Sequence, residues 1–334
     1  MATSPVSSPD QSSAPSSVRP SPLLSLPGAV AAEAPDEGVA AHYGDPLREQ
    51  RRLAEGRGFV DLSHRGVVRV SGPDRLSWLH SLTTQYLTGL KPGEATLTLV
   101  LSPHGHIEHA MYAVDDGEAL WAHVEPGTAP ALVAFLDRMR FLLRVEVEDV
   151  TDAYAVVFEP VPEPLADAAG PPARVTADGR ELFLPRADLA AFGAEHADPA
   201  GMWAYEALRI AAHRPRVGNE TDHRTIVHEV GWIDTAVHLD KGCYRGQETV
   251  ARVQNLGRPP RRLVFLHLDG TEEKLPATGA PVELDGRPVG FVTSAARHHE
   301  LGTIALALIK RNTAVDAVLR ADGVPASQEV VVPA

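Results

Sequence analysis

The chain contains one cysteine, and the residues around it are of types that could do chemistry. Cys243 lies in the segment 241–248, which reads Lys-Gly-Cys-Tyr-Arg-Gly-Gln-Glu. A lone cysteine cannot form a disulfide within the chain, so it is either a packing residue or a reactive one. The cations Lys241 and Arg245 would favour a thiolate, and the two glycines permit tight turns that place a side chain at a cleft. Cys243 is therefore a candidate working thiol, with a small buried thiol as the alternative.

Six cations gather between positions 241 and 262 of a chain that is acidic overall. The sequence has 31 Lys and Arg against 44 Asp and Glu, a formal net charge of −13. Such a protein repels nucleic acid over most of its surface, so direct DNA or RNA binding is not expected. The local cations predict a site for a carboxylate or phosphate, with a solvated loop as the alternative. They are Lys241, Arg245, Arg252, Arg258, Arg261 and Arg262.

Histidines near the cysteine raise two further kinds of site. They stand at positions 213, 223, 228 and 238. Their spacings match no common zinc pattern and there is no second cysteine, so no tightly bound metal is expected. A histidine could act as the base for a cysteine nucleophile. Glu108 beside His109 could transfer protons, although adjacent residues of a strand point to opposite faces. No phosphate-binding loop or dinucleotide fingerprint is present.

The hydrophobic pattern predicts an α+β architecture that ends in a small barrel. Strands are expected over 65–71, 96–101, 106–114 and 119–124, separated by turn residues. A helix is expected from Pro130 to Met139, and another from about Pro199 to His213, capped by Asp198 and with Trp203 on its core face. Short strands after Arg262 predict a β-barrel or sandwich.

Composition divides the chain into four parts. Residues 1–40 are rich in Ser, Pro and Ala and predict a disordered tail. Residues 41–150 form an N-terminal α+β domain, 151–257 a central α+β region that can interleave with the first, and 258–334 the barrel. No apolar run is long enough to span a bilayer, no secretory signal opens the chain, and the single cysteine fits a reducing compartment. We therefore expect a cytoplasmic protein without membrane contact, and a monomer.

The segment 241–248, continued by Thr249-Val250-Ala251-Arg252, resembles the signature of the YgfZ family, the iron–sulfur-maintenance branch of the glycine-cleavage T-protein superfamily. The likeness extends to segments 90–93, 207–220 and 228–232. It implies three domains in a cloverleaf around a central hole, with a C-terminal barrel. It also implies tetrahydrofolate or a derivative as the ligand of that hole. Iron–sulfur proteins or cluster carriers would be the partners, with only an indirect effect on tRNA modification.

The resemblance also implies site residues. Cys243 would be the working thiol, with Lys241 and Tyr244 beside it as the other catalytic candidates. The candidates for binding the folate-type ligand are Arg209, Glu229, Arg245, Gln247, Glu248 and Arg252, the last holding an anionic group.

Two departures from the superfamily pattern bear on function. Where aminomethyltransferases carry an acidic pair after a glycine turn, this chain has Glu108-His109, which speaks against the glycine-cleavage reaction. The position of the superfamily's pterin-binding glutamate is Ala211, and Glu229 or Asp222 are candidate substitutes.

Three functions therefore stand side by side. The first is a YgfZ-like accessory protein for iron–sulfur cluster assembly or repair. The second is a folate-dependent one-carbon transferase of the aminomethyltransferase type. The third is a non-catalytic scaffold that docks cluster carriers through its acidic surface.

Overall fold

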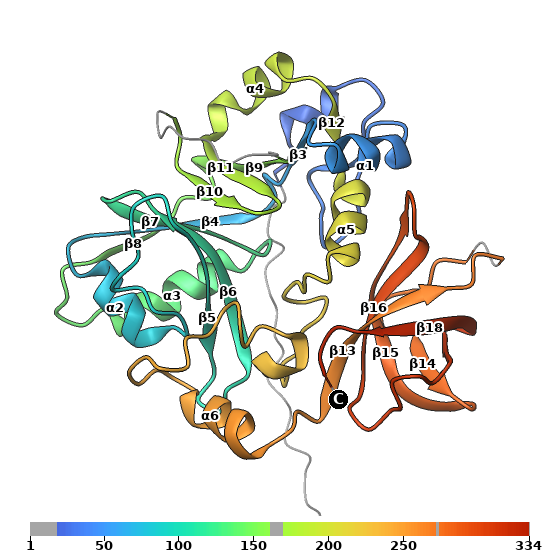
Figure 1. The fold of residues 1–334 in the computed structure, drawn as a ribbon. Helices are drawn as coiled ribbons and strands as arrows, with labels where there is room; N and C mark the ends of the chain where they lie inside the picture. Colours follow the sequence, from blue (N-terminus) through green and yellow to red (C-terminus); the bar gives the residue numbers. More distant parts are fainter. Residues whose placement is uncertain (1–18, 161–169, 272–273, 334) are drawn as a thin grey trace, which may run out of the picture.

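The computed structural model describes residues 19–160, 170–271 and 274–333. Two five-stranded sheets and a closed barrel form its frame (Figure 1). The first sheet has the strand order β5-β6-β7-β4-β8. Its strands are β4 (Gly66–Ser71), β5 (Ala95–Leu101), β6 (Ile107–Asp115), β7 (Ala119–Val124) and β8 (Glu146–Asp149). Because side chains alternate along a strand, Val68 and Val70 pack under helices α2 (Arg75–Leu82) and α3 (Ala129–Met139), while Val67 faces the second sheet.

The second sheet has the order β10-β11-β9-β3-β12, and its strands come from before and after the first sheet in the sequence. The strands are β3 (Phe59–Asp61), β9 (Tyr154–Glu159), β10 (Ala173–Thr176), β11 (Gly179–Pro185) and β12 (Pro199–Ala200). β3 pairs with β9 although the whole first sheet lies between them in sequence. Helices α1 (Pro46–Ala54), α4 (Leu189–Glu195) and α5 (Met202–Ala211) accompany this sheet, and α5 lies between it and the barrel (Figure 1).

The barrel closes in the order β13-β16-β15-β14-β17-β18. Its strands are β13 (Arg261–Leu268), β14 (Pro281–Leu284), β15 (Arg287–His298), β16 (Gly302–Lys310), β17 (Leu319–Ala321) and β18 (Val324–Val330). Val264 and Leu266 belong to its own core. Leu263 and Phe265, on the other face of β13, pack in a cluster with Ile210 of α5. The predicted α+β class with a C-terminal barrel is therefore confirmed.

Part of the predicted disordered tail is ordered. Residues 19–40 include the 3-10 helix η1 (Pro22–Ser25) and strand β1 (Val30–Ala31), which pairs with β2 (Ala40–His42). Leu23 and Val39 are buried. The prediction is wrong here because these scattered apolar residues meet partners far along the chain, which their local composition does not reveal. Residues 1–18, and residues 161–169 of the predicted linker, lie outside the described residues.

The helix predicted from Pro199 is real, but its start and its core face differ from the prediction. α5 begins after Gly201, and Asp198 has a φ of 64°, so it does not cap the helix. Trp203 is 57 % exposed rather than buried, and its ring lies 4.9 Å from that of His42. The helix α6 (Gln247–Leu256) was not predicted.

None of the helices in the described part of the chain is both long enough and apolar enough to cross a bilayer. Within the same residues, no group of three or more His, Cys, Asp or Glu is placed to hold a metal ion.

Candidate functional site

A buried ionic network connects helix α5, the barrel and the segment between β1 and β2. The guanidinium of Arg216 donates to Asp36 at 2.6 Å and to Glu125 at 2.6 Å. Arg209 of α5 donates to Glu220 at 2.9 Å, and Glu220 accepts from Ser294 of the barrel at 2.5 Å. Buried charges of this kind need every partner in place, so the network fixes the parts relative to one another.

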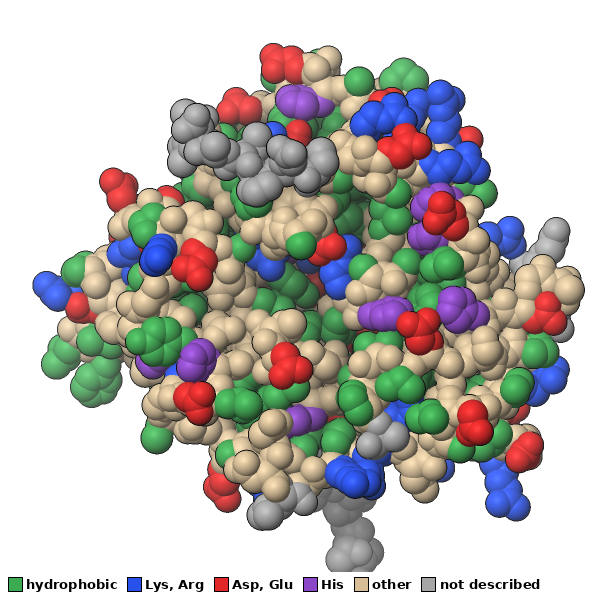
Figure 2. All heavy atoms as spheres, in the orientation of Figure 1, with side chains coloured by type: hydrophobic (Ala, Val, Ile, Leu, Met, Phe, Trp, Pro, Cys, Tyr) green, Lys and Arg blue, Asp and Glu red, His purple; other side chains and the backbone are tan. Residues whose placement is uncertain are grey.

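An inner cavity of about 360 Å³ lies beside this network. Aromatic side chains form part of its wall: Tyr112, Phe158, Tyr205 and Trp232. Five arginines form another part: Arg65, Arg174, Arg209, Arg214 and Arg216. Figure 2 shows the surface hollowed near its centre, with Lys or Arg side chains visible in the hollow. A flat ring with an anionic tail matches such a wall.

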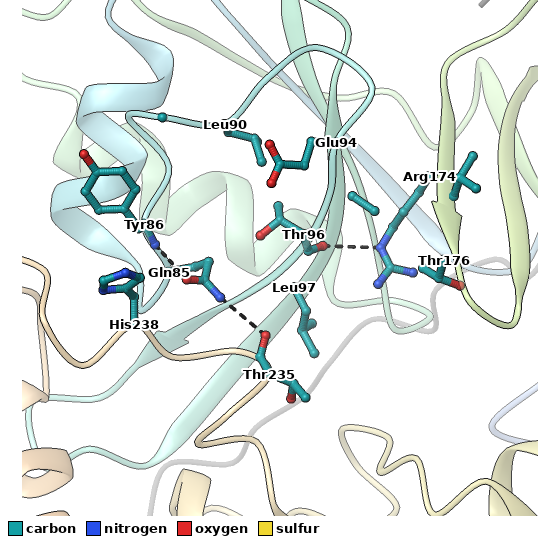
Figure 3. Close-up of a pocket in the computed structure, with 13 residues that line it drawn as sticks. Gln85, Tyr86, Leu90, Glu94, Thr96, Leu97, Arg174, Thr176, Thr235 and His238 are labelled. Carbon is teal, nitrogen blue, oxygen red and sulfur yellow. Dashed lines mark hydrogen bonds between the residues drawn. The ribbon is translucent and has the colours of Figure 1, made fainter. Parts of the chain in front are cut away.

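An outer cavity of about 630 Å³ adjoins the inner one (Figure 3). Leu97, Arg174, Thr176 and Thr235 line both. In Figure 3, Arg174 reaches from β10 to the carbonyl oxygen of Thr96, to which its Nε donates at 3.3 Å. Arg174 thus stands at the junction of the two cavities, and together they can hold an elongated ligand.

A charged and aromatic cluster surrounds Arg174. Its Nη1 donates to Glu181 Oε2 at 2.8 Å, and its guanidinium lies 5.4 Å from the centre of the Tyr112 ring. His123 Nε2 lies 2.9 Å from the same Glu181 oxygen, and the His123 ring stacks on Tyr112 at 4.9 Å with an interplanar angle of 8°. The four side chains hold one another in fixed positions on the cavity wall.

The charge states in this cluster follow from its surroundings. Burial opposes ionisation of Glu181, but Arg174 and His123 outweigh it and hold the pKa of that carboxyl well below its usual range. Burial lowers the pKa of His123, with Glu181 acting in the opposite sense. We therefore assign an ionised Glu181 and a neutral His123 whose Nε2–H donates to it.

Several buried polar atoms of the cavity-lining residues have no hydrogen-bond partner among the described residues. They are His123 Nδ1, Arg65 Nε and Arg214 Nε. Buried polar groups without partners are uncommon in folded proteins. Within the described part of the chain, these three atoms are therefore buried without a partner in residues that line the cavity.

The 241–248 segment lies against the first sheet domain. Lys241 is buried, and its ammonium donates to the carbonyl oxygens of His80, Thr83 and Gln85. Burial lowers the pKa of Lys241 to about 8. Arg245 donates to Glu108 at 2.8 Å. The two cations that stand beside the cysteine in the sequence therefore have other partners.

Cys243 is exposed and unpaired, so the alternative of a buried packing thiol is wrong. Tyr244 is buried beside it, with the ammonium of Lys241 5.0 Å from its ring centre, and burial raises the pKa of Tyr244 to about 12. Tyr244 packs in the core, and the thiol faces outwards.

The other predicted residues are spread over the molecule. Arg209 lines the inner cavity. Glu229 is 1 % exposed and accepts from Arg261 at 2.8 Å, and Arg261 also donates to Asp222 at 2.7 Å. Both candidate substitutes for a carboxylate at Ala211 are thus engaged by one arginine. The residues Gln247, Glu248 and Arg252 all lie on α6 and line neither cavity.

Four residues of the cavity wall were not predicted as site residues: Tyr112, His123, Arg174 and Glu181. The sequence carries a signal for Arg174 and Glu181, because the segment between them, Ala177-Asp178-Gly179, is a turn sequence. The hairpin β10–β11 pairs Arg174 directly with Glu181. That this hairpin meets Tyr112 of β6 and His123 of β7 depends on how the two sheets pack, which the local pattern does not show.

Two family models match the chain. The GCVT N-terminal domain matches residues 39–158, and the glycine cleavage T-protein C-terminal barrel domain matches residues 261–331. The second match spans all of the barrel strands.

Similar proteins agree with these matches. The chain is 28 % identical to a putative chloroplastic transferase of Arabidopsis thaliana, over 84 % of this chain and 71 % of that protein. It is 28 % identical to an aminomethyltransferase of Streptomyces coelicolor, over 80 % of this chain and 82 % of the other. The crystal structure of the glycine cleavage system aminomethyltransferase T from Bartonella henselae superposes with a TM-score of 0.77 at 18 % identity, over 92 % of this chain and 94 % of that one. With both domain models matched and the fold shared, the chain is a member of the glycine-cleavage T-protein superfamily.

Proposed function

We propose that the central cavities bind a tetrahydrofolate-type ligand. A folate has a flat pterin ring, an aromatic linker and an anionic glutamate tail. The inner cavity combines aromatic side chains with five arginines. This combination around one cavity is the observation that supports the proposal, since it matches the flat ring and the anionic tail of a folate.

The walls also suggest how the ligand lies. The pterin fits the inner cavity, where Tyr112 and His123 are stacked. The tail fits near Arg214, which lines the inner cavity, is 34 % exposed and donates to Asp178 at 2.8 Å. The 241–262 cations do not line either cavity, so the structure offers no support for Arg252 as the residue that holds the tail.

Titration calorimetry with tetrahydrofolate tests this proposal. The wild type should bind, and Arg214→Ala should bind about tenfold more weakly, equivalent to ~1.4 kcal/mol for a lost charged contact. Arg252→Ala distinguishes the two locations of the tail and should leave the affinity unchanged. Arg320→Ala, an exposed arginine of the barrel, is the matched control. No binding by the wild type contradicts the proposal.

For the cellular role, we propose a YgfZ-like accessory protein for iron–sulfur cluster assembly or repair. An exposed thiol in a loop anchored by Lys241 supports it, together with the signature-like segment itself. Cys243 would act as the thiol presented to iron–sulfur proteins or cluster carriers. Gln247 and Glu248, in the first turn of α6, would hold the shape of that loop.

Complementation of a cell with a cluster-repair defect tests this role. Cys243→Ala should fail to complement while its melting temperature stays within about 2 °C of the wild type, because an exposed side chain contributes little to stability. Arg258→Ala, an exposed surface change, should complement fully. Full complementation by Cys243→Ala contradicts the thiol's role.

A folate-dependent one-carbon transferase is the second candidate, because similar proteins carry the names aminomethyltransferase and putative transferase. One feature of the chain disfavours it. Glu108 is exposed, pairs with Arg245, and like His109 is absent from the lining of both cavities. Formation of methylenetetrahydrofolate from tetrahydrofolate and an aminomethyl donor would establish transfer. A scaffold role would instead give salt-sensitive binding of cluster carriers that persists in Cys243→Ala.

A further inference from the structure

We infer that Glu181 is the residue that selects the ligand's ring, by accepting hydrogen bonds from adjacent N–H groups on its edge. This inference rests on the proposed folate-type function and names the chemical class that the inner cavity recognises. That class is a planar heteroaromatic ring with a 2-amino-4-oxo pyrimidine edge, which carries two neighbouring N–H donors. A carboxylate is the side chain best matched to such an edge.

The free oxygen of Glu181 is the first observation. The side chain is buried, and both of its hydrogen bonds reach one atom, Oε2, from His123 at 2.9 Å and Arg174 at 2.8 Å. Within the part of the chain that the structure describes, nothing donates to Oε1. A carboxylate oxygen has two lone pairs, so Oε1 keeps its full acceptor capacity for a ligand.

The second observation is that Glu181 is held ready. Its two partners fix the carboxylate from one side, and they come from different strands, β7 and β10. The same partners keep the group ionised, as argued above, so it acts as an acceptor only. A preorganised, desolvated acceptor discriminates more strongly between donors and acceptors on a ligand than an exposed one does.

The third observation is the surface beside the carboxylate. His123 stacks on Tyr112, and Arg174 covers the Tyr112 ring at 5.4 Å. All of these residues line the same inner cavity as Glu181. A flat ring hydrogen-bonded to Oε1 would therefore find aromatic surface close by, as well as the cationic surface that suits a ring carbonyl.

The other carboxylates near the centre are already engaged. Glu125 accepts from Arg216, and Glu206 and Glu220 accept from Arg209. Glu229 and Asp222, the substitutes expected from the sequence, accept from Arg261. Asp178 lines the cavity, but it is 44 % exposed and paired with Arg214. Among the described residues that line the inner cavity, Glu181 is the buried carboxylate with an oxygen that accepts no hydrogen bond.

A pair of matched probes tests the inference: pterin, with a 2-amino group, and lumazine, in which a carbonyl oxygen replaces that group. We expect the wild type to bind pterin at least about tenfold more tightly, because lumazine keeps only the N3–H donor at this edge and its 2-oxo oxygen would face the carboxylate with no hydrogen between them. In Glu181→Gln the amide can donate to that oxygen, so the preference should fall to about threefold or less. Glu300, whose side chain is 75 % exposed, provides the control: Glu300→Gln should keep the wild-type preference for pterin.

The outcomes separate the two proposals. If tetrahydrofolate binds but Glu181→Gln keeps the pterin preference, the role of Glu181 is overturned and the folate-type function stands. If the wild type binds neither tetrahydrofolate nor the two probes, both proposals are overturned. If Glu181→Gln fails to fold, Glu181→Asp, which keeps the charge but withdraws the oxygen, should bind pterin more weakly while still disfavouring lumazine. A wild type without a preference overturns the inference whatever the variants do.

Discussion

Lys241 donates from Nζ to the carbonyl oxygen of Thr83 at 2.5 Å, across 158 positions of sequence. The carbonyl oxygens of His80 and Gln85 accept from the same ammonium. These acceptors lie at and just after the C-terminal end of α2, where the helix dipole favours a positive charge. The lysine of the 241–248 segment therefore anchors the loop to the first sheet domain and leaves Cys243 to face solvent.

Replacing this anchor should loosen the loop. Lys241→Met leaves three carbonyl groups without their donor, and we expect a loss of about 2–3 kcal/mol in unfolding free energy. Urea unfolding measures the loss, and hydrogen exchange should quicken in residues 241–246. Lys310→Met, an exposed lysine of β16, should change neither. Equal behaviour of the two variants would show that the anchor contributes nothing.

The central ionic network should be sensitive to loss of one arginine. Arg216→Met leaves Asp36 and Glu125 buried without their shared cation, which costs about 3–5 kcal/mol in comparable buried pairs. Because Asp36 lies between β1 and β2, the variant should also be cut faster by protease within residues 19–40. Arg138→Met, an exposed change on α3, is the comparison. Unchanged proteolysis in Arg216→Met would show that Arg216 does not hold residues 19–40 in place.

Stability should fall as the pH drops from 7 to 5. Burial lowers the pKa of several histidines in the folded protein, among them His109, His123 and His228. The unfolded chain binds protons at these positions below about pH 6.5 while the folded chain does not, so protonation favours unfolding at up to ~1.4 kcal/mol per pH unit for each group. Urea unfolding at pH 7, 6 and 5 measures the slope.

One histidine should account for part of that slope. His123→Gln removes a titrating group but retains an N–H donor for Glu181, so its stability should depend less on pH than that of the wild type. The lowered pKa of the Glu181 carboxyl acts only below about pH 4.5, where the unfolded carboxyl takes up protons, and does not interfere. An identical slope in wild type and variant would contradict a neutral His123.

The two glycines of the 241–248 segment should tolerate substitution differently. A Cβ on Gly246, whose φ is 82°, would lie 2.6 Å from the Ser102 carbonyl oxygen and 2.9 Å from Gly105 Cα. A Cβ on Gly242 would meet nothing within 4 Å. We expect Gly246→Ala to lose about 1–3 kcal/mol of stability and Gly242→Ala almost none. Thermal unfolding measures both losses. A larger loss of stability in Gly242→Ala than in Gly246→Ala would contradict the position of this loop in the structure.

Elements whose apolar periodicity is local could be predicted from the sequence. The strands β5, β6 and β7 and the helix α3 match their alternating or helical apolar patterns. The predictions were wrong for Trp203 and for residues 19–40. The exposure of Trp203 and the ordering of residues 19–40 depend on contacts with residues that are distant in the sequence. The inner cavity could not be predicted from the sequence for the same reason. His123 and Glu181 lie 58 positions apart and meet only when the two sheets come together.

The most direct test of the central claim is a crystal structure of the protein with tetrahydrofolate. We predict the pterin ring in the inner cavity, within hydrogen-bond distance of Glu181 Oε1, and the glutamate tail towards Arg214. A ligand bound outside both cavities, for example beside Arg252 on α6, would contradict the account. So would an empty cavity in crystals saturated with the ligand.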